Sequence, residues 1–216
     1  IVVGCGLGQD PVAVRLLAQV FAGGSAVVCD ADALTLLAQA PDRYPRRAGA
    51  TILTPHPLEA ARLLGTTTPA VQADRIGAAI AIAKRYRAVV VLKGPGTVVA
   101  DAAGHYAINA SGHPVLATGG TGDVLGGIIG ALAAAWQAAA APRGGAPRPA
   151  GAATTPIPPI PPITAIAALA ACAGVWLHGA AGERLAASIG PAGVPAGRLC
   201  EMLPVVLGSL AQRNGI

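Results

Sequence analysis

The chain has 216 residues, of which 53% are hydrophobic, 12% are charged and 3% are aromatic. This composition excludes an intrinsically disordered chain, which needs low hydrophobicity and high net charge, and the length suits one α/β domain or two small ones. The formal charge of +5 is scattered along the sequence. A nucleic-acid-binding protein needs a clustered basic face, so we expect small anionic ligands such as phosphates instead.

The apolar stretch that most resembles a membrane span, residues 163–177, is short and rich in alanine. A membrane span takes about 20 strongly apolar residues, so we expect no membrane contact. The four cysteines form no CxxC pair, which is typical of reduced thiols in a cytoplasmic protein. We recognise no signal peptide, and because the sequence starts directly on an apolar strand at Ile1, we expect an upstream segment to be missing.

Four short runs rich in valine and isoleucine predict strands over residues 1–4, 26–29, 51–54 and 88–93. Each run is continuous rather than alternating, as in strands buried on both faces of a parallel sheet. The segments between them predict helices that begin at Asp10-Pro11 and that cover 31–40, 57–64 and 71–86. Alternating strands and helices predict a three-layer α/β fold.

The pattern then changes. Runs at 97–101 and 105–109 flank a short turn and predict an antiparallel hairpin. A glycine-rich turn at 117–123 leads to a small-residue helix over 124–141, and two more helices are predicted over 163–187 and about 197–213. Residues 142–162 are rich in proline and glycine and predict a disordered surface insertion. A polyproline ligand at its end is a less favoured alternative.

The first turn reads GCGLG over residues 4–8. A dinucleotide-binding fingerprint would need a further glycine where the chain has Gln9. The next helix also starts with Asp10, whose carboxylate takes the place of a pyrophosphate at the helix dipole. This disfavours a dehydrogenase and leaves two interpretations, a tight strand-to-helix turn or a ligand-facing loop of another kind.

The strongest local signal is GGTGDVLGG at residues 119–127. Three glycines before a helix leave backbone N–H groups free to bind an anion, and the helix dipole adds to the attraction. Asp123 would lie in the first helical turn. A carboxylate there is poorly placed to bind phosphate but well placed to accept a proton from a hydroxyl that attacks a phosphoryl group. The alternative is a structural helix cap.

Other polar side chains follow the predicted strands, at the sheet edge where α/β folds bind ligands. Lys93 ends the fourth strand ahead of a Gly-Pro-Gly turn, although a solvated lysine before a turn would look the same. His56, Glu59 and Arg62 are spaced to share a helix face. They would either contact a polar substrate or form a surface cap with a Glu59–Arg62 ion pair.

Two aspartates and three histidines complete the candidates. Asp30 and Asp32 could hold a metal ion or a hydroxyl, and Asp30 alone would more often cap a helix. His105, His113 and His178 fit no triad or metal spacing, and we interpret them as structural or incidental.

Five motifs, GCGLG, VVCDADAL, TILTPHPLEAARLLG, VVVLKGPGTVVAD and NASGHPVLATGGTGDVLGGIIGAL, resemble in order and spacing those of the ADP-dependent NAD(P)H-hydrate dehydratases. The later LHGAAGERLA is similar to that family's next helix. The resemblance implies a single ribokinase-like domain over residues 1–216, a three-layer αβα sandwich whose mostly parallel sheet ends in an antiparallel hairpin. It also implies that the family's usual N-terminal segment is absent.

The resemblance implies that the S-epimer of NADH hydrate or NADPH hydrate is dehydrated to the normal cofactor. ADP would phosphorylate the ring hydroxyl, phosphate would leave, and AMP would be the other product. Mg²⁺ is expected for phosphoryl transfer, with ligands that no residue identifies. A cytoplasmic homo-oligomer (a homotetramer by resemblance) and a fused or separate epimerase partner are also implied. The alternatives are a ribokinase-like kinase of a small alcohol and a non-catalytic nucleotide-binding fragment.

The same resemblance assigns site residues. Asp123 would deprotonate the hydroxyl and also contact the hydrate. The ADP contacts would be Lys93, Gly94, Pro95, Gly96, Thr97, His113, Pro114, Val115, Leu116, Ala117, Thr118, Gly119, Gly120, Thr121 and Gly122. The remaining contacts to the hydrate would be Gly6, Gly8, His56, Pro57, Leu58, Glu59, Ala60, Ala61 and Arg62.

The sequence departs from the family pattern at three positions. Cys5 replaces a proline, Leu58 replaces a glycine and Thr35 replaces an asparagine. Leu58 would crowd the substrate if the backbone approaches it closely. The donor (ADP or ATP) and the preferred hydrate stay open.

Overall fold

The computed structural model describes residues 1–44, 47, 49–140, 163–190 and 194–213. In this part of the chain, six strands form one sheet in sequence order, with the first four parallel and the last two antiparallel to their neighbours. The predicted mixed sheet with a late hairpin is therefore confirmed. The strands are β1 (Val2–Val3), β2 (Val27–Cys29), β3 (Thr51–Leu53), β4 (Val89–Leu92), β5 (Val98–Ala100) and β6 (Tyr106–Ile108).

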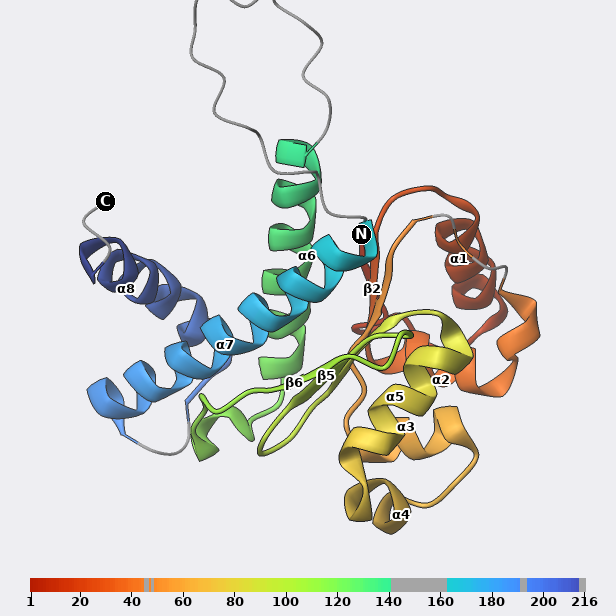
Figure 1. Ribbon diagram of the computed structural model, residues 1–216, viewed down its shortest axis with the longest axis horizontal. Helices are drawn as coiled ribbons and strands as arrows, with labels where there is room; N and C mark the ends of the chain where they lie inside the picture. Colours follow the sequence, from red (N-terminus) through yellow and green to blue (C-terminus); the bar gives the residue numbers. More distant parts are fainter. Residues whose placement is uncertain (45–46, 48, 141–162, 191–193, 214–216) are drawn as a thin grey trace, which may run out of the picture.

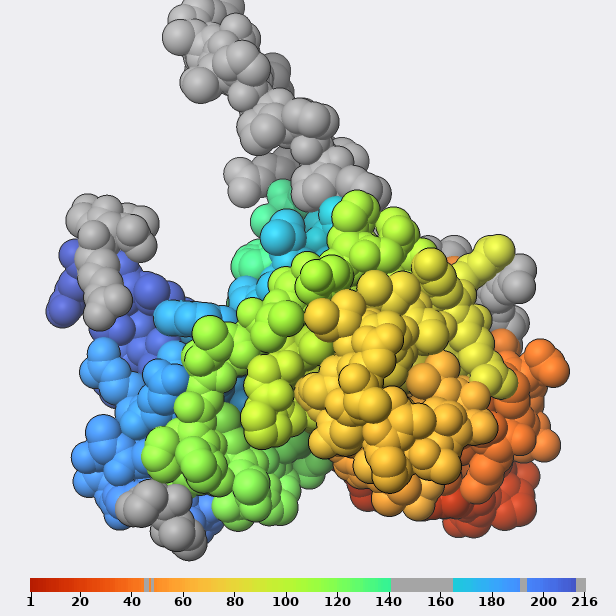
Figure 2. Space-filling view, turned by 60° about the horizontal axis from the view of Figure 1, so that its bottom comes forward, coloured from red at the N-terminus to blue at the C-terminus, as the bar shows by residue number. Residues whose placement is uncertain are grey.

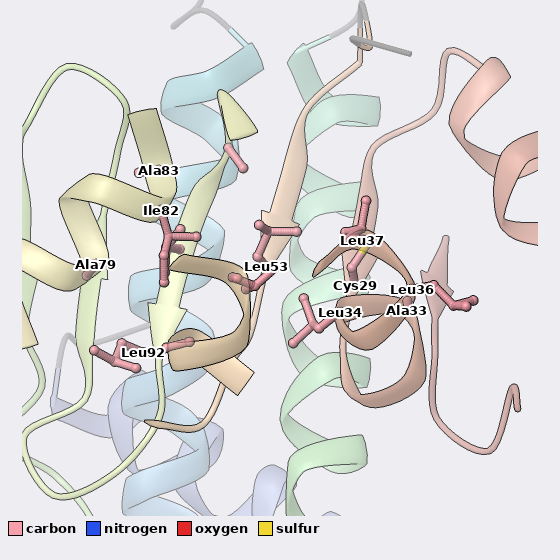
Figure 3. Packing of buried hydrophobic residues seen from close by; sticks show 14 of the residues in the cluster. Cys29, Ala33, Leu34, Leu36, Leu37, Leu53, Ala79, Ile82, Ala83 and Leu92 are labelled. Carbon is pink, nitrogen blue, oxygen red and sulfur yellow. The ribbon is translucent and has the colours of Figure 1, made fainter. Parts of the chain in front are cut away.

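One face of the sheet packs against helices from the first half of the chain (Figure 1). Buried strand residues such as Leu53 and Leu92 point toward Ile82 of α5 and Leu34 of α2 in a shared hydrophobic cluster (Figure 3). These helices are α1 (Pro11–Ala22), α2 (Ala31–Gln39), α3 (Pro57–Leu64), α4 (Thr68–Ala73) and α5 (Arg75–Tyr86), with a short 3₁₀ turn η1 (Pro41–Arg43).

The opposite face is covered by α6 (Thr121–Ala140) and α7 (Ile163–Ile189), which makes the three layers. Leu125 and Ile129 of α6 share a buried cluster with strand residues such as Ile52. Beyond the sheet, α8 (Gly197–Arg213) packs against α7 in a third cluster. In Figure 2, the green hairpin β5–β6 lies between the yellow helices of the first half and the blue helices of the second.

Two element predictions need correction. The single helix predicted over 71–86 is two helices, because Asp74 adopts non-helical backbone angles and its side chain caps α5 by accepting from the Gly77 N–H at 2.7 Å. The helix predicted from residue 124 begins at Thr121, whose hydroxyl bonds back to the Leu116 carbonyl at 2.7 Å and fixes the turn into the helix. The predicted insertion at 142–162 lies outside the described residues.

The apolar helices are longer than the sequence indicated. Two segments, Thr121–Ala140 and Ala165–Ile189, are long and apolar enough to cross a membrane by length and composition alone. Core helices pass the same test, and 67% of the apolar window in α7 is buried inside the protein, where Ala167 and Ala171 pack against the sheet. The corresponding share in α6 is 22%.

The carboxyl ends of the parallel strands bring the polar motifs to one edge. Gly4 directly follows β1 with φ +121°, and a Cβ there would overlap the Asp30 carbonyl oxygen. Only glycine tolerates both constraints. The 4–8 turn is thereby held against the start of α2.

Candidate active site

A buried ion pair forms the floor of the site. Asp30, at the end of β2, is 2% exposed, and its Oδ1 accepts a 2.6 Å hydrogen bond from Lys93 Nζ at the end of β4. Asp30 makes no helix-capping bond and Lys93 is only 20% exposed. Asp30 thus occupies the N-cap position of α2 while its side chain serves the ion pair, and the interpretation of Lys93 as a solvated side chain is wrong.

Glu59 of α3 joins this floor. Its Oε2 lies 4.0 Å from Lys93 Nζ and accepts from the His56 N–H at 2.7 Å, while His56 Nδ1 accepts from the Glu59 N–H. This reciprocal capping box starts α3. Burial raises the pKa of the Glu59 carboxyl, and the His56 N–H and Lys93 partly oppose the rise. The ion pairs of the described residues do not include the Glu59–Arg62 pair of the alternative surface-cap interpretation.

The glycine-rich turn lies directly above the floor. A Cβ at Gly122 would meet Asp30 Oδ2 at 3.3 Å and Lys93 Nζ at 3.4 Å, so a larger residue here would crowd the ion pair, and glycine lets the first turn of α6 lie close to it. Gly120 has φ +87°, and Gly119 has open space around it. Their N–H groups and the N-terminus of α6 provide positive potential for an anion.

Asp123 is the third residue of α6 and is exposed, so it lies inside the helix rather than at the cap position. Side-chain ligand atoms of Asp123, Asp30 and Cys5 lie within 4.8 Å of one another. Burial, followed by the neighbouring Asp123 carboxylate, raises the pKa of the Cys5 thiol to about 12. The thiol therefore stays protonated at neutral pH beside the Asp123 carboxylate.

The turn after β1 is fastened to α2. Asp32 accepts from the Gly8 N–H at 2.9 Å and from the Gln9 side chain at 3.1 Å. Gly6 and Gly8 both have positive φ and open space around them, as a ligand-facing turn requires. Next to this turn is a cavity of about 430 Å³ that Gln9, Thr35 and Arg62 help to line. Arg62 thus lies on the cavity side rather than beside Glu59.

The loop after β4 is held in place by Arg75 of α5. Its guanidinium donates to the Leu92 carbonyl at 3.0 Å and to the Lys93 carbonyl at 3.3 Å, and it lies against Gly94. Within this loop, the Thr97 hydroxyl donates a hydrogen bond to the Gly94 carbonyl at 2.8 Å. The sequence offered no signal for Arg75, because the contact joins residues that are far apart in the chain.

The second predicted nucleotide segment begins with η2 (Pro114–Leu116), which His113 caps by accepting from the Val115 N–H at 3.2 Å. Asn109 N–H donates to the Thr97 carbonyl at 2.9 Å and so joins this segment to the loop after β4. Two residues outside the predicted set make contacts here: His178 contacts Thr121 in this segment, and Glu183 contacts Gly112 directly ahead of it. In the sequence, only the LHGAAGE motif at residues 177–183 points to His178 and Glu183.

Comparison with known proteins shows which family this chain belongs to. A family model described as NAD(P)H-hydrate dehydratase matches residues 1–205. The chain belongs to the NAD(P)H-hydrate dehydratase family. It is 43% identical over 203 residues to the ADP-dependent (S)-NAD(P)H-hydrate dehydratase of Neisseria meningitidis, covering 92% of this chain and 59% of that protein. It is 38% identical to a bifunctional NAD(P)H-hydrate repair enzyme of Moorella thermoacetica, covering 97% of this chain and 34% of that enzyme.

A solved structure agrees with the family. The ADP/ATP-dependent NAD(P)H-hydrate dehydratase of Bacillus subtilis, co-crystallised with ATP and Mg²⁺ and soaked with coenzyme A, superposes with a TM-score of 0.74 at 29% identity. The alignment covers 97% of this chain and 65% of that one. The ribokinase-like fold is thereby shown. This member of the dehydratase family spans less than two thirds of the length of these relatives.

In this dehydratase-family chain, the structure brings several of the predicted site residues to one edge of the sheet. Lys93, Gly122 and Asp123 gather around Asp30, and the Gly6–Gly8 turn faces the same edge from β1. Leu58, the departure from the family glycine, is 47% exposed near the start of α3. Whether it contacts the hydrate stays a prediction.

Proposed function

We propose that this chain dehydrates (S)-NADH hydrate and (S)-NADPH hydrate in an ADP-dependent reaction that repairs the nicotinamide cofactor. The observation that carries the proposal is the position of Asp123, an exposed carboxylate one residue beyond a glycine turn that can bind a phosphoryl group. The names of the Neisseria and Moorella relatives support the same reaction.

In the proposed reaction, Asp123 accepts the proton of the ring hydroxyl while that oxygen attacks the terminal phosphoryl group of ADP. The bond between that phosphorus and the bridging oxygen breaks, and AMP leaves. N–H groups of the 119–122 turn stabilise charge on the transferring group. The ring nitrogen lone pair then expels phosphate, and loss of a proton from the neighbouring ring carbon completes the dihydronicotinamide.

Magnesium fits this site only together with the nucleotide. The nearby carboxylates are Asp123 and Asp30, and Asp30 is already neutralised by Lys93. Mg²⁺ usually keeps several waters and binds one or two carboxylates plus substrate phosphates. We propose that it arrives on the ADP phosphates, with Asp123 the carboxylate within reach, and supplies charge neutralisation there. Bifunctional relatives support an epimerase, fused or separate, that provides the S-epimer, and we propose a cytoplasmic homo-oligomer.

Product analysis tests the proposal against a kinase of the same fold. The protein, incubated with ADP, Mg²⁺ and NADH hydrate, should release one AMP and one phosphate for each dihydronicotinamide formed. A stable phosphorylated alcohol without free phosphate would instead identify a small-alcohol kinase. Nucleotide binding without either product would identify a non-catalytic binding protein.

A further inference from the structure

The segment of α7 from Trp176 to Glu183 carries the LHGAAGE motif, which the proposed reaction does not use. In the described part of the chain, this segment contacts residues 111–112, directly ahead of the predicted nucleotide run 113–122, and Leu116 and Thr121 within it. Residues 176, 179 and 183 follow the three-and-four spacing of one helix face, and all three contact the turn at 109–112. On the neighbouring face, His178 contacts Thr121, and Gly182 leaves room for the Leu116 side chain, which a Cβ at 182 would meet at 2.7 Å.

The turn ahead of His113 is braced on the first face. The Gly112 N–H donates to Glu183 Oε1 at 2.8 Å, and Ser111 Oγ donates to the Trp176 carbonyl at 3.1 Å. A Cβ at Gly179 would lie within 2.8 Å of the Ser111 carbonyl group. The close approach therefore requires glycine at this position, since backbone cannot move aside as a flexible side chain can.

The first turn of α6 is braced on the second face. His178 Nε2 lies 2.8 Å from the Thr121 carbonyl oxygen, which can only accept, so the ring donates from Nε2. The ring is mostly buried, and burial lowers the pKa of His178, which keeps the imidazole neutral. Thr121 is two residues before Asp123, so the same bond orients both the N–H groups of the turn and the proposed base.

We propose that His178 and Glu183 are positioning residues of the nucleotide site, with His178 holding the phosphate-binding turn and Glu183 holding the segment that precedes His113. Neither residue needs to touch the nucleotide for this role. The inference deepens the proposed function and rests on it for the identity of the nucleotide, ADP.

Two variants of Glu183 separate the effect of its acceptor oxygen from the effect of its negative charge. Glu183→Ala removes the acceptor and should raise both the Kd and the KM for ADP about tenfold, as expected for a lost hydrogen bond to a charged group. Glu183→Gln keeps an acceptor oxygen and should stay near the unchanged protein. Arg184→Ala, at an exposed neighbouring position, is the matched control and should have no effect.

The His178 contact has a matching pair of variants. His178→Phe keeps a ring but removes the donor, and it should raise the KM for ADP by a similar factor. His178→Gln retains an N–H donor and should recover most of the affinity. A merely structural role would lower the folded fraction and hence the apparent kcat, but it would leave the KM and Kd of the folded molecules unchanged.

The measurements are calorimetric titration with ADP and Mg²⁺ and the steady-state KM for ADP, both on protein whose folding is checked by circular dichroism. ADP affinities that are equal in Glu183→Ala, His178→Phe and the unchanged protein would overturn the inference, as would absence of ADP binding by the unchanged protein. If the unchanged protein binds ADP but forms no dihydronicotinamide, the proposed function fails while the titrations still decide the positioning roles.

Discussion

Replacing Asp123 with Asn should reduce kcat for dehydration about 10²–10⁴-fold, the usual contribution of a positioned general base. The amide has nearly the shape of the carboxylate but cannot accept the proton of the ring hydroxyl. Because the N–H groups of the 119–122 turn are unaffected, the affinity for ADP measured without Mg²⁺ should hold or rise slightly as a negative charge disappears. The experiment compares single-turnover rates and ADP titrations.

A matched control is Asp42→Asn, which removes one carboxylate from the exposed 3₁₀ turn η1. It should leave both the rate and the ADP affinity unchanged. A kcat for Asp123→Asn equal to that of the control would show that another group takes the proton, and the mechanism would then be wrong.

Replacing Lys93 with Met should lower the free energy of unfolding by about 3–5 kcal/mol, the usual cost of removing one partner of a buried ion pair. Asp30 is 2% exposed and would lose the 2.6 Å bond from Lys93 Nζ, and Glu59 would lose the nearest positive charge. The methionine fills nearly the same volume, so the loss would come from the uncompensated carboxylate rather than from a cavity. Urea unfolding at neutral pH measures the effect.

Two further variants separate charge from packing. Lys84→Met, on the exposed side of α5, removes an equal charge and should cost little. The double variant Asp30→Asn with Lys93→Met removes the unpaired charge of Asp30 and should be more stable than Lys93→Met alone. A Lys93→Met protein as stable as the Lys84→Met protein would contradict the assignment of the pair as the floor of the site.

Much of the fold was readable from the sequence because its signals are local. Continuous Val-rich runs mark β2 and β4, and the Pro57 start and Gly65 end of α3 are capping signals that the structure reproduces, with Gly65 left-handed at φ +68°. The break between α4 and α5 at Asp74 is not predictable from the apolar spacing, which continues across it. Only the hydrogen bond from the Gly77 N–H to the Asp74 side chain shows where α5 begins.

The site was predictable as a set of motifs but not as a set of contacts. Lys93 and Asp30 are 63 positions apart, and their strands are separated in the sheet by β3, so no spacing rule relates them. The sequence predicts His178 only as structural or incidental, because its partner is a backbone carbonyl, which carries no sequence signature. Contacts to main-chain atoms depend on the packing of α7 against α6.

The most direct test of the account is the return of dihydronicotinamide absorbance when the protein meets NADH hydrate with Mg²⁺, with and without ADP. We expect the absorbance to recover only when ADP is present, and not in the Asp123→Asn protein. Recovery that is independent of ADP, or no recovery while ADP still binds, would contradict the proposal that this site couples phosphoryl transfer to dehydration.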